Sequence, residues 1–318
     1  LRARPGWPIL AGVRVVITGA TGLLGRSLAQ RLREAGHAVL PVSRKPGPGV
    51  VRWDPARGQL AAEALEGCDA VVNLAGARIA PARWTEAYKR ELRTSRVDAT
   101  RLLSDALSRL AEPPRVFLSA SATGYYGHRT FEEAVDESAP PGRGFLASLC
   151  VDWEAATEPA RRSGIRTVLL RTGPVLSGRG GFLAPLLPVF RLGLGGPVGD
   201  GRQGVSWIAL EDWLRAVEFL MNTPSVEGPV NLTAPGAVTF AEFARTLAGV
   251  LRRPAFLRVP AFAVRWVLGR EMADEVLLSG QRAIPRRLLE AGFRFRYPDL
   301  EAGLRAVLGS TGRHPEAD

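Results

Sequence analysis

The sequence predicts an α/β fold in which a doubly wound parallel sheet is followed by a smaller, mainly helical C-terminal part. Two observations predict it. In the first half, short apolar segments rich in β-branched residues alternate with segments whose apolar residues recur at helical spacing, as in parallel sheets covered by helices on both faces. After Gly173, glycine-rich loops and helical segments interrupted by proline replace this alternation.

The strands and helices of the first half follow from its apolar pattern. In the first helix, Leu24, Leu28 and Leu32 recur at helical spacing, and Gly36 follows where a helix is expected to end. The predicted strands are residues 13–18, 38–43, 69–75, 115–119 and 165–171. The further predicted helices are residues 84–110 and 145–163.

The second half begins with glycine-rich loops over residues 178–181 and 193–204. These loops are too long for simple connections, and such loops usually border a ligand. Residues 207–220 indicate a strand followed by a helix, and residues 239–308 are mostly helical. The loops are therefore expected to border a small-molecule substrate. The candidate residues are Arg179, Arg202, Gln203 and Trp207, and a structural role in the loops is the alternative for them.

Composition limits the function classes. The net charge of +11 suggests nucleic acid, but the arginines are spread along the chain and Lys45 and Lys89 are the only lysines. We therefore expect solvated surface charge and no nucleic-acid partner. No stretch approaches the roughly 18 apolar residues of a membrane helix, so no membrane partner is expected. Cys68 and Cys150 lack metal-ligand neighbours, which predicts no metal site and a reducing compartment, the cytoplasm or the mitochondrial matrix.

A glycine-rich loop follows the first predicted strand and opens the first helix. Its glycines have the spacing G-x-x-G-x-x-G. In dinucleotide-binding folds of the Rossmann type, the first glycine permits a tight turn, the second lets the backbone approach a pyrophosphate, and the third allows close helix–strand packing. The alternative is a tight turn that binds nothing. The expected cofactor-binding residues are Gly19, Thr21, Gly22, Leu23, Leu24 and Gly25.

The residues after the second strand predict which dinucleotide is bound. Sites for NAD usually place an Asp or Glu there, which accepts a hydrogen bond from the ribose 2′-hydroxyl. This chain has Ser43, Arg44 and Lys45 instead, a hydroxyl and two cations that suit a 2′-phosphate. We therefore expect NADP(H) as the cofactor, with Ser43 and Arg44 among its ligands. Ordinary surface cations are the alternative.

Several motifs together resemble the extended short-chain dehydrogenases/reductases. They are the glycine-rich loop, NLAG ending at Gly76, GYYG ending at Gly127 and RTG ending at Gly173. The motifs SRKPGPG and RLGLGG and a C-terminal segment that begins with GQR resemble, more closely, an atypical epimerase-like branch with a C-terminal domain of unknown function. The resemblance covers about residues 13–308. It implies the fold and the cofactor, and it leaves the substrate open.

The resemblance also implies further cofactor contacts. Leu74 and Ala75 would pass near the adenosine ribose and the pyrophosphate, and Val175 would lie beside the nicotinamide. Core packing is the alternative for these three residues. Glu91 and Arg96 would face the cofactor from a helix, with an ordinary surface pair as the alternative.

The catalytic pair of active short-chain dehydrogenases is missing. Those enzymes use Tyr-x-x-x-Lys on a helix, in which the lysine holds the ribose and lowers the phenol pKa. None of the four tyrosines is followed by lysine at this spacing. Aligning the motif with the helix that contains Trp153 puts Leu146 and Cys150 at the two positions, and a shift by one puts Phe145 and Leu149 there.

Two functional hypotheses remain. In the first, the chain is an NADP-dependent oxidoreductase or epimerase-like enzyme of unknown substrate; Ser121 orients a carbonyl, and Tyr125 or Tyr126 donates the proton, with His128 as a lesser candidate. Packing beside the cofactor pocket is the alternative for the tyrosines. In the second, the chain binds NADPH without turnover, as a redox sensor or structural subunit. Cys150 is expected to be a small buried apolar side chain.

These observations divide the chain into four segments, and a homodimer is one expectation for its assembly. The segments are an N-terminal extension (residues 1–12), an NADP-binding domain (13–175), a substrate-pocket and helical region that interleaves with the sheet through 205–235 (176–310) and a tail (311–318).

Overall fold

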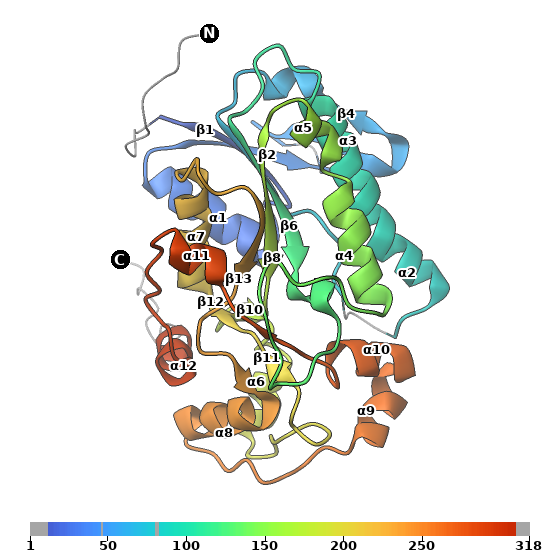
Figure 1. The fold of residues 1–318 in the computed structure, drawn as a ribbon, viewed down its shortest axis with the longest axis vertical. Coiled ribbons are helices and arrows are strands. Elements are labelled where there is room, and N and C mark those ends of the chain that lie inside the picture. Colours follow the sequence, from blue (N-terminus) through green and yellow to red (C-terminus); the bar gives the residue numbers. More distant parts are fainter. Residues whose placement is uncertain (1–11, 46, 80–82, 310–318) are drawn as a thin grey trace.

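The computed structural model describes residues 12–45, 47–79 and 83–309. The predicted tail and all of the predicted extension except Gly12 lie outside these residues. The centre of the described chain is an eight-stranded sheet (Figure 1). In spatial order its strands are β13 (Gly228–Leu232), β8 (Arg166–Thr172), β6 (Val116–Ala122), β5 (Ala70–Asn73), β1 (Arg14–Thr18), β2 (Ala38–Ser43), β3 (Val51–Asp54) and β4 (Gln59–Leu60).

Seven of these described strands run parallel, and β4 runs antiparallel to β3. The strand order reverses between β1 and β5, because the chain proceeds outward through β2 on one side and through β6 on the other. Doubly wound sheets bind ligands at such a reversal, in the crevice outside the carboxyl ends of the strands. The predicted doubly wound parallel sheet is confirmed.

Helices cover both faces of the sheet, on either side of it in Figure 1. Val15 and Ile17 of β1 pack in one apolar core with residues of α1 and α7, whereas Val16 packs in the opposite core with residues of α3. This alternation is what a strand buried on both faces requires. The first layer contains α1 (Leu23–Glu34), α7 (Leu210–Met221) and α11 (Arg286–Glu290). The second contains α2 (Glu86–Arg93), α3 (Ala99–Leu107), α4 (Phe145–Ala155) and α5 (Glu158–Arg162).

The second half forms a smaller part at the lower end of the molecule in Figure 1, with its own apolar core around Phe190, Trp207 and Phe243. The chain returns to the main sheet through α7 and β13 before it enters the C-terminal helices, which confirms the predicted helical part. The elements of this part are β9 (Val175–Ser177), β10 (Gly180–Gly181), α6 (Leu186–Arg191), β11 (Gly204–Val205), β12 (Ile208–Ala209), β14 (Val238–Thr239), α8 (Phe240–Leu251), α9 (Ala261–Leu268), α10 (Arg270–Val276), β15 (Arg282–Ala283) and α12 (Leu300–Gly309).

Strands β3 and β4 were not predicted, and three further segments differ from the prediction for local reasons. The helix predicted over residues 84–110 is interrupted by a π-helical turn, η3 (Thr94–Asp98). The helix predicted over residues 145–163 ends at Ala155, and α5 begins at Glu158 with Pro159, which has no N–H to continue a helix. Strand β13 was not predicted, because its sequence GPVNL contains glycine and proline, which are rare inside strands.

The short elements complete the first half. They are η1 (Pro55–Arg57), η2 (Ala62–Leu65), η4 (Thr123–Tyr126) and β7 (Ala134–Val135). Strand β7 pairs with β15, so the loop after η4 is tied to the C-terminal part. A second tie is made by Glu275 of α10, whose carboxylate accepts hydrogen bonds from the N–H groups of Phe145 and Leu146, both at 2.7 Å. A carboxylate at this position satisfies the free N–H groups that begin α4.

Candidate functional site

The glycine-rich loop joins β1 to α1, and close contacts explain its glycines. Gly19 has a φ of +66°, and a Cβ there would lie 2.6 Å from the carbonyl oxygen of Leu74. A Cβ on Gly25 would lie 2.3 Å from the carbonyl oxygen of Gly19, so only glycine allows this approach of α1 to the loop. A Cβ on Gly22 would meet that oxygen alone, at 3.3 Å, so the outer side of Gly22 is open among the described residues.

The first turn of α1 points free N–H groups away from the helix. Gly22 is the N-cap and makes no side-chain cap, and the first turn contains no acidic residue. The N–H of Arg26 bonds the Gly22 carbonyl oxygen at 2.9 Å, so the N–H groups of Leu23 and Leu24 come before the first intrahelical bond. Thr21 and Gly22 are exposed. This geometry fits an anion such as a pyrophosphate.

Thr18 and Asn73 fix the crevice between β1 and β5. The Thr18 hydroxyl donates to Asn73 Oδ1 at 2.6 Å and accepts from the N–H groups of Leu74 and Ala75 at 3.1 and 3.2 Å. The Asn73 amide then donates to Thr100 Oγ1 at 2.8 Å. These bonds hold Leu74 and Ala75, two predicted cofactor contacts, directly beside the glycine-rich loop.

A pocket of about 240 Å³ lies between α1 and the end of β2. Its lining residues are Ala20, Thr21, Arg26, Ala29, Arg33, Pro41, Ser43, Lys45 and Val50. Three of these side chains are cations, two carry hydroxyls, and no carboxylate is among them. Such a set suits a phosphate group, which accepts charge-assisted hydrogen bonds.

This pocket contains Thr21 and Ser43, which the sequence predicted as cofactor ligands. Arg44 is exposed and is not among the lining residues, so its place at a cofactor stays a prediction. The sequence analysis missed Arg26 and Arg33. Their spacing of seven residues, which puts two side chains on one face of a helix, is the signal that could have found them.

The predicted helical contacts Glu91 and Arg96 have different surroundings. Glu91 is exposed on α2. Arg96 is 7% exposed in the π-helical turn, where Nη2 donates to the carbonyl oxygen of Ala77 at 2.8 Å and Nη1 to that of Leu92 at 3.3 Å. Desolvation by burial lowers its pKa. Arg96 therefore supports the loop that follows Leu74, and its contact with a cofactor remains a prediction.

A buried polar network occupies the carboxyl ends of β6 and β8. Ser121 donates to Glu154 Oε1 at 2.6 Å, and Arg171 donates to both oxygens of Glu154 at 2.8 Å. Arg171 Nη1 also donates to the hydroxyl of Tyr126 at 3.1 Å. Burial lowers the pKa of Arg171, but the hydrogen bond and charge of Glu154 outweigh it, and the pKa is raised. The predicted residues Ser121 and Tyr126 are thus joined in one network.

The two adjacent tyrosines are placed differently in this network. Tyr126 is fully buried, and its hydroxyl donates to Asn231 Oδ1 at 2.7 Å. Desolvation raises its pKa to about 12. The packing interpretation therefore fits Tyr126 better than proton donation does. Tyr125 is half-buried, and the Arg171 guanidinium carbon lies 3.5 Å from the centre of its ring. Its hydroxyl has no hydrogen bond among the described residues.

Helix α4 carries apolar residues at the positions that align with the Tyr-x-x-x-Lys pair of active short-chain dehydrogenases. A Cβ on Gly124 of η4 would lie 3.6 Å from Leu146 and 3.9 Å from Cys150, so these two face the end of β6. This favours the first of the two alignments. Cys150 is 4% exposed, and desolvation raises its pKa to about 12. It is a buried thiol, as the sequence predicted.

One glycine-rich loop of the second half, around Gly181, packs against the glycine-rich loop between β1 and α1. A Cβ on Gly181 would lie 3.2 Å from the Leu23 side chain and 3.3 Å from the carbonyl oxygen of Val175, so this segment covers the start of α1. Arg179 in the same loop is exposed. Val175, predicted to contact the nicotinamide, lies in β9 and is 9% exposed.

For two of the four candidate substrate contacts, the structural alternative fits. Trp207 is fully buried and donates to the carbonyl oxygen of Gly236, and Gln203 is buried and donates to the carbonyl oxygen of Leu277. Their side chains stabilise the C-terminal part, because buried polar atoms need such partners. Arg202 is exposed, as is His128.

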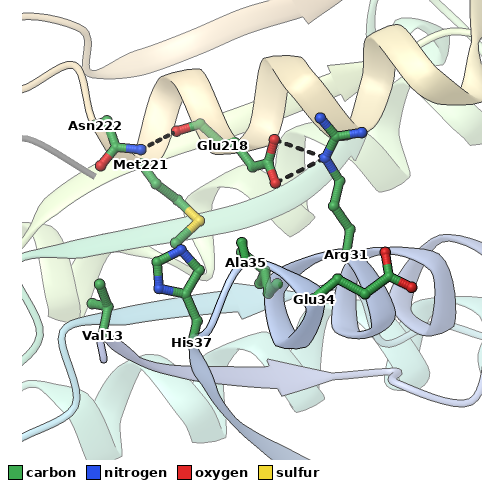
Figure 2. A pocket seen from close by; sticks show the side chains of 9 residues that line it. Val13, Arg31, Glu34, Ala35, His37, Glu218, Met221 and Asn222 are labelled. Carbon is green, nitrogen blue, oxygen red and sulfur yellow. Dashed lines mark hydrogen bonds and ion pairs between the residues drawn. The ribbon is translucent and has the colours of Figure 1, made fainter. Parts of the chain in front are cut away.

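A larger pocket, of about 440 Å³, lies away from this edge (Figure 2). Val13 and His37, which line it, come immediately before β1 and β2, so the pocket is at the amino ends of the strands. Arg31 bonds both Glu218 and Glu211 here, with Nε to Glu218 distances of 2.8 and 2.9 Å. The cluster joins α1 to α7, and we assign it a structural role.

Comparisons with known proteins agree with this geometry. Residues 15–232 match the NAD dependent epimerase/dehydratase family, and residues 259–307 match a domain of unknown function, DUF1731. The chain is 47% identical over 290 residues to epimerase family protein Mb2239 of Mycobacterium bovis, covering 91% of this chain and 95% of that protein. It is 40% identical over 301 residues to the human epimerase family protein SDR39U1, covering 93% and 100%.

A crystal structure of the human epimerase family protein SDR39U1 (isoform 2) with NADPH is similar throughout. Its TM-score to this chain is 0.87 with 38% sequence identity, and the match covers 93% of this chain and 99% of that one. The likeness therefore extends over both the sheet and the C-terminal part.

Proposed function

Because the chain belongs to the NAD dependent epimerase/dehydratase family, we propose that it binds NADPH across the carboxyl edge of its sheet. The free N–H groups of Leu23 and Leu24 would hold the pyrophosphate, which needs donors and no side chain at Gly22. That the human relative was crystallised with NADPH supports the proposal.

The observation that carries the choice of NADPH over NADH is the cationic pocket beside Ser43. Arg26, Arg33 and Lys45 line it, and no lining carboxylate would accept a ribose hydroxyl. Arg33 and Lys45 have no ion pair among the described residues, so a 2′-phosphate would supply the missing negative charge. Cations without partners at a hydroxyl-lined pocket are what separates a phosphate site from a hydroxyl site.

Calorimetry tests this selectivity. We expect NADPH to bind more tightly than NADH, and Arg33→Gln or Lys45→Gln to weaken NADPH by about 10-fold each, as charge-assisted bonds do, while NADH changes little. Arg162→Gln is the matched control, because Arg162 is exposed on α5. Equal affinities for the two dinucleotides in the wild type would contradict the choice of NADPH, and no heat with any dinucleotide would contradict the whole proposal.

NADPH supplies a hydride when bound, and we propose that the chain uses it as an epimerase-like oxidoreductase on a small carbonyl compound. Tyr125 is the side chain we assign as proton donor, because its hydroxyl is uncommitted while that of Tyr126 is shared between Asn231 and Arg171. Ser121 already donates to Glu154, so it would orient a substrate only after exchanging that bond.

The second candidate function is NADPH binding without turnover, and α4 favours it. Leu146 and Cys150 offer neither a phenol nor a cation at the usual positions. Incubation of the protein and NADPH with a panel of carbonyl compounds separates the two candidates. Oxidation of NADPH that Tyr125→Phe abolishes and Tyr126→Phe retains supports the oxidoreductase. Tight NADPH retention with no oxidation by any compound supports the second candidate.

A further inference from the structure

An unusually exposed apolar surface surrounds α9 at the lower end of the molecule in Figure 1. Phe256, Phe262 and Trp266 are 76%, 74% and 78% exposed. Phe262 and Trp266 are four residues apart on one helix, so they project from the same side. Leu257 and Val267 are exposed beside them in sequence. We call these five residues the aromatic patch. These exposed apolar residues come from one stretch of the chain, residues 256–267, and exposed apolar groups of this kind often mark a contact with a partner.

A second loop extends the aromatic patch. Leu192 and Leu194, which follow α6, are 74% and 53% exposed. A Cβ on Gly193, between them, would lie 3.3 Å from Pro254 in the segment that leads to Phe256. Two loops that are about 60 residues apart in sequence are therefore in contact, and each carries exposed apolar side chains.

The chain segment that carries the aromatic patch is rich in positive charge. Residues 243–270 contain six arginines and neither aspartate nor glutamate. Arg252, Arg253 and Arg258 are exposed, and none of them has an ion pair or a side-chain hydrogen bond among the described residues. By contrast, Arg265 pairs with Asp274 of α10 at 2.7 Å. Three uncompensated cations therefore lie in the chain segment that carries Phe256.

We propose that this face docks on the surface of an anionic lipid bilayer. Phe256, Phe262 and Trp266 would enter the boundary between headgroups and acyl chains, where aromatic rings are favoured, while the arginines contact anionic headgroups. None of the described helices is long and apolar enough to cross a membrane. The sequence analysis expected no membrane partner because no apolar stretch approaches the length of a membrane-spanning helix. A short helix that lies on the surface needs no such length.

Two other occupants fit the charges and shapes less well. A symmetric second copy would place Arg252, Arg253 and Arg258 against the same residues, and like charges across an interface are repulsive. Single-stranded nucleic acid would accept the arginines and stack on the aromatic rings, but it would leave the exposed aliphatic Leu192 and Leu194 without an apolar partner. An anionic bilayer satisfies both the cations and the aliphatic side chains.

Co-sedimentation of the full chain with vesicles tests the proposal. We expect binding to phosphatidylcholine vesicles that contain about 30% phosphatidylserine, weaker binding as salt is added, and little binding to phosphatidylcholine alone. Replacing Arg252, Arg253 and Arg258 together by Gln should weaken partitioning by about 100-fold. Phe262→Ser with Trp266→Ser should abolish it at low vesicle concentration.

The matched control removes the same charge elsewhere. Arg101, Arg109 and Arg294 are exposed and have no ion pair among the described residues, so their joint replacement by Gln lowers the net charge equally. We expect this control to keep most of the vesicle binding. Circular dichroism and a cooperative urea transition check that every variant is folded, whether or not NADPH binds.

Four results would overturn the proposal. They are absence of binding to the anionic vesicles, equal binding to neutral vesicles, and equal losses in the control and in the Arg252, Arg253 and Arg258 variant. The fourth is a concentration-dependent dimer, or a complex with a single-stranded oligonucleotide, that the Phe262 and Trp266 substitutions abolish while vesicle binding is unchanged.

Discussion

Two neighbouring regions at the carboxyl edge of the sheet have opposite character. Around the glycine-rich loop, backbone N–H groups and the cations Arg33 and Lys45 lack partners among the described residues, and the surface is open. Around Ser121, the polar side chains are buried and paired with one another through Glu154 and Arg171. The first region has hydrogen-bond donors and cations that a ligand could meet, and in the second region the polar side chains already bond to one another.

This difference indicates that dinucleotide binding depends on the glycine-rich loop, whereas proton transfer depends on the region where α4 faces the carboxyl ends of β6 and β8. The first needs the backbone of one loop and a few cations, so it tolerates change in most side chains. The second usually needs two side chains at fixed positions of α4, where this chain has Leu146 and Cys150, so any proton donor must come from elsewhere, such as Tyr125. The predictions below test how separate the two regions are.

The largest expected effect is on the buried pair. Arg171→Leu leaves the carboxylate of Glu154, which is 10% exposed, without its partner, and should lower the free energy of unfolding by about 4 kcal/mol. Urea denaturation measures it. Arg162→Leu removes an exposed pair with Glu158 and should cost less than about 1 kcal/mol. Similar losses in the free energy of unfolding of the two variants would show that the ion pair of Arg171 and Glu154 is not buried.

Alkaline pH tests the same region through Tyr126. Its pKa is about 12 in the folded chain against an ordinary value of 10.0, so between these pH values the unfolded chain loses the proton and the folded chain keeps it. The stabilising contribution is complete below pH 10 and lost as pH rises through 12. It amounts to about 3 kcal/mol.

The measurement compares wild type with Tyr126→Phe in urea at pH 9 and pH 11.5. We expect the wild type to lose more stability than the variant over this interval, and Tyr125→Phe to behave like the wild type. A wild-type tyrosinate absorbance that reaches its full value near pH 10.5 would contradict the burial of Tyr126.

Gly25→Ala tests whether the glycine-rich loop binds NADPH. The new Cβ would lie 2.3 Å from the carbonyl oxygen of Gly19, so the loop must move away from α1. We expect a loss of about 2 kcal/mol in stability and of most NADPH affinity. Gly249→Ala in α8 meets nothing within 4 Å among the described residues and should stabilise by about 1 kcal/mol without changing NADPH binding. Unchanged NADPH affinity in Gly25→Ala would show that the glycine-rich loop does not bind the cofactor.

Local patterns were enough to predict five of the eight strands of the described sheet and the open region. Strand β2 was predicted with its observed bounds, and the glycine spacing between Gly19 and Gly25 located the turn, because both depend on residues adjacent in sequence. The lining residues Thr21 and Ser43 came from the same local motifs.

The network around Ser121 could not be predicted, because its contacts join distant residues. Glu154 meets Ser121 and Arg171 across 33 and 17 positions, and no local pattern reports such pairs. The burial of Trp207 and Gln203 likewise depends on C-terminal helices that pack over a glycine-rich loop. In the sequence alone, a polar or aromatic residue beside glycines looks the same whether it lines a binding loop or packs in a core.

The most direct test of the central claim is a structure of this chain with NADPH bound. We expect the pyrophosphate at the N–H groups of Leu23 and Leu24, the 2′-phosphate in the pocket of Ser43, Arg33 and Lys45, and the network around Arg171 unchanged. A 2′-phosphate outside that pocket, or Tyr126 released from Asn231 to reach the nicotinamide, would contradict it.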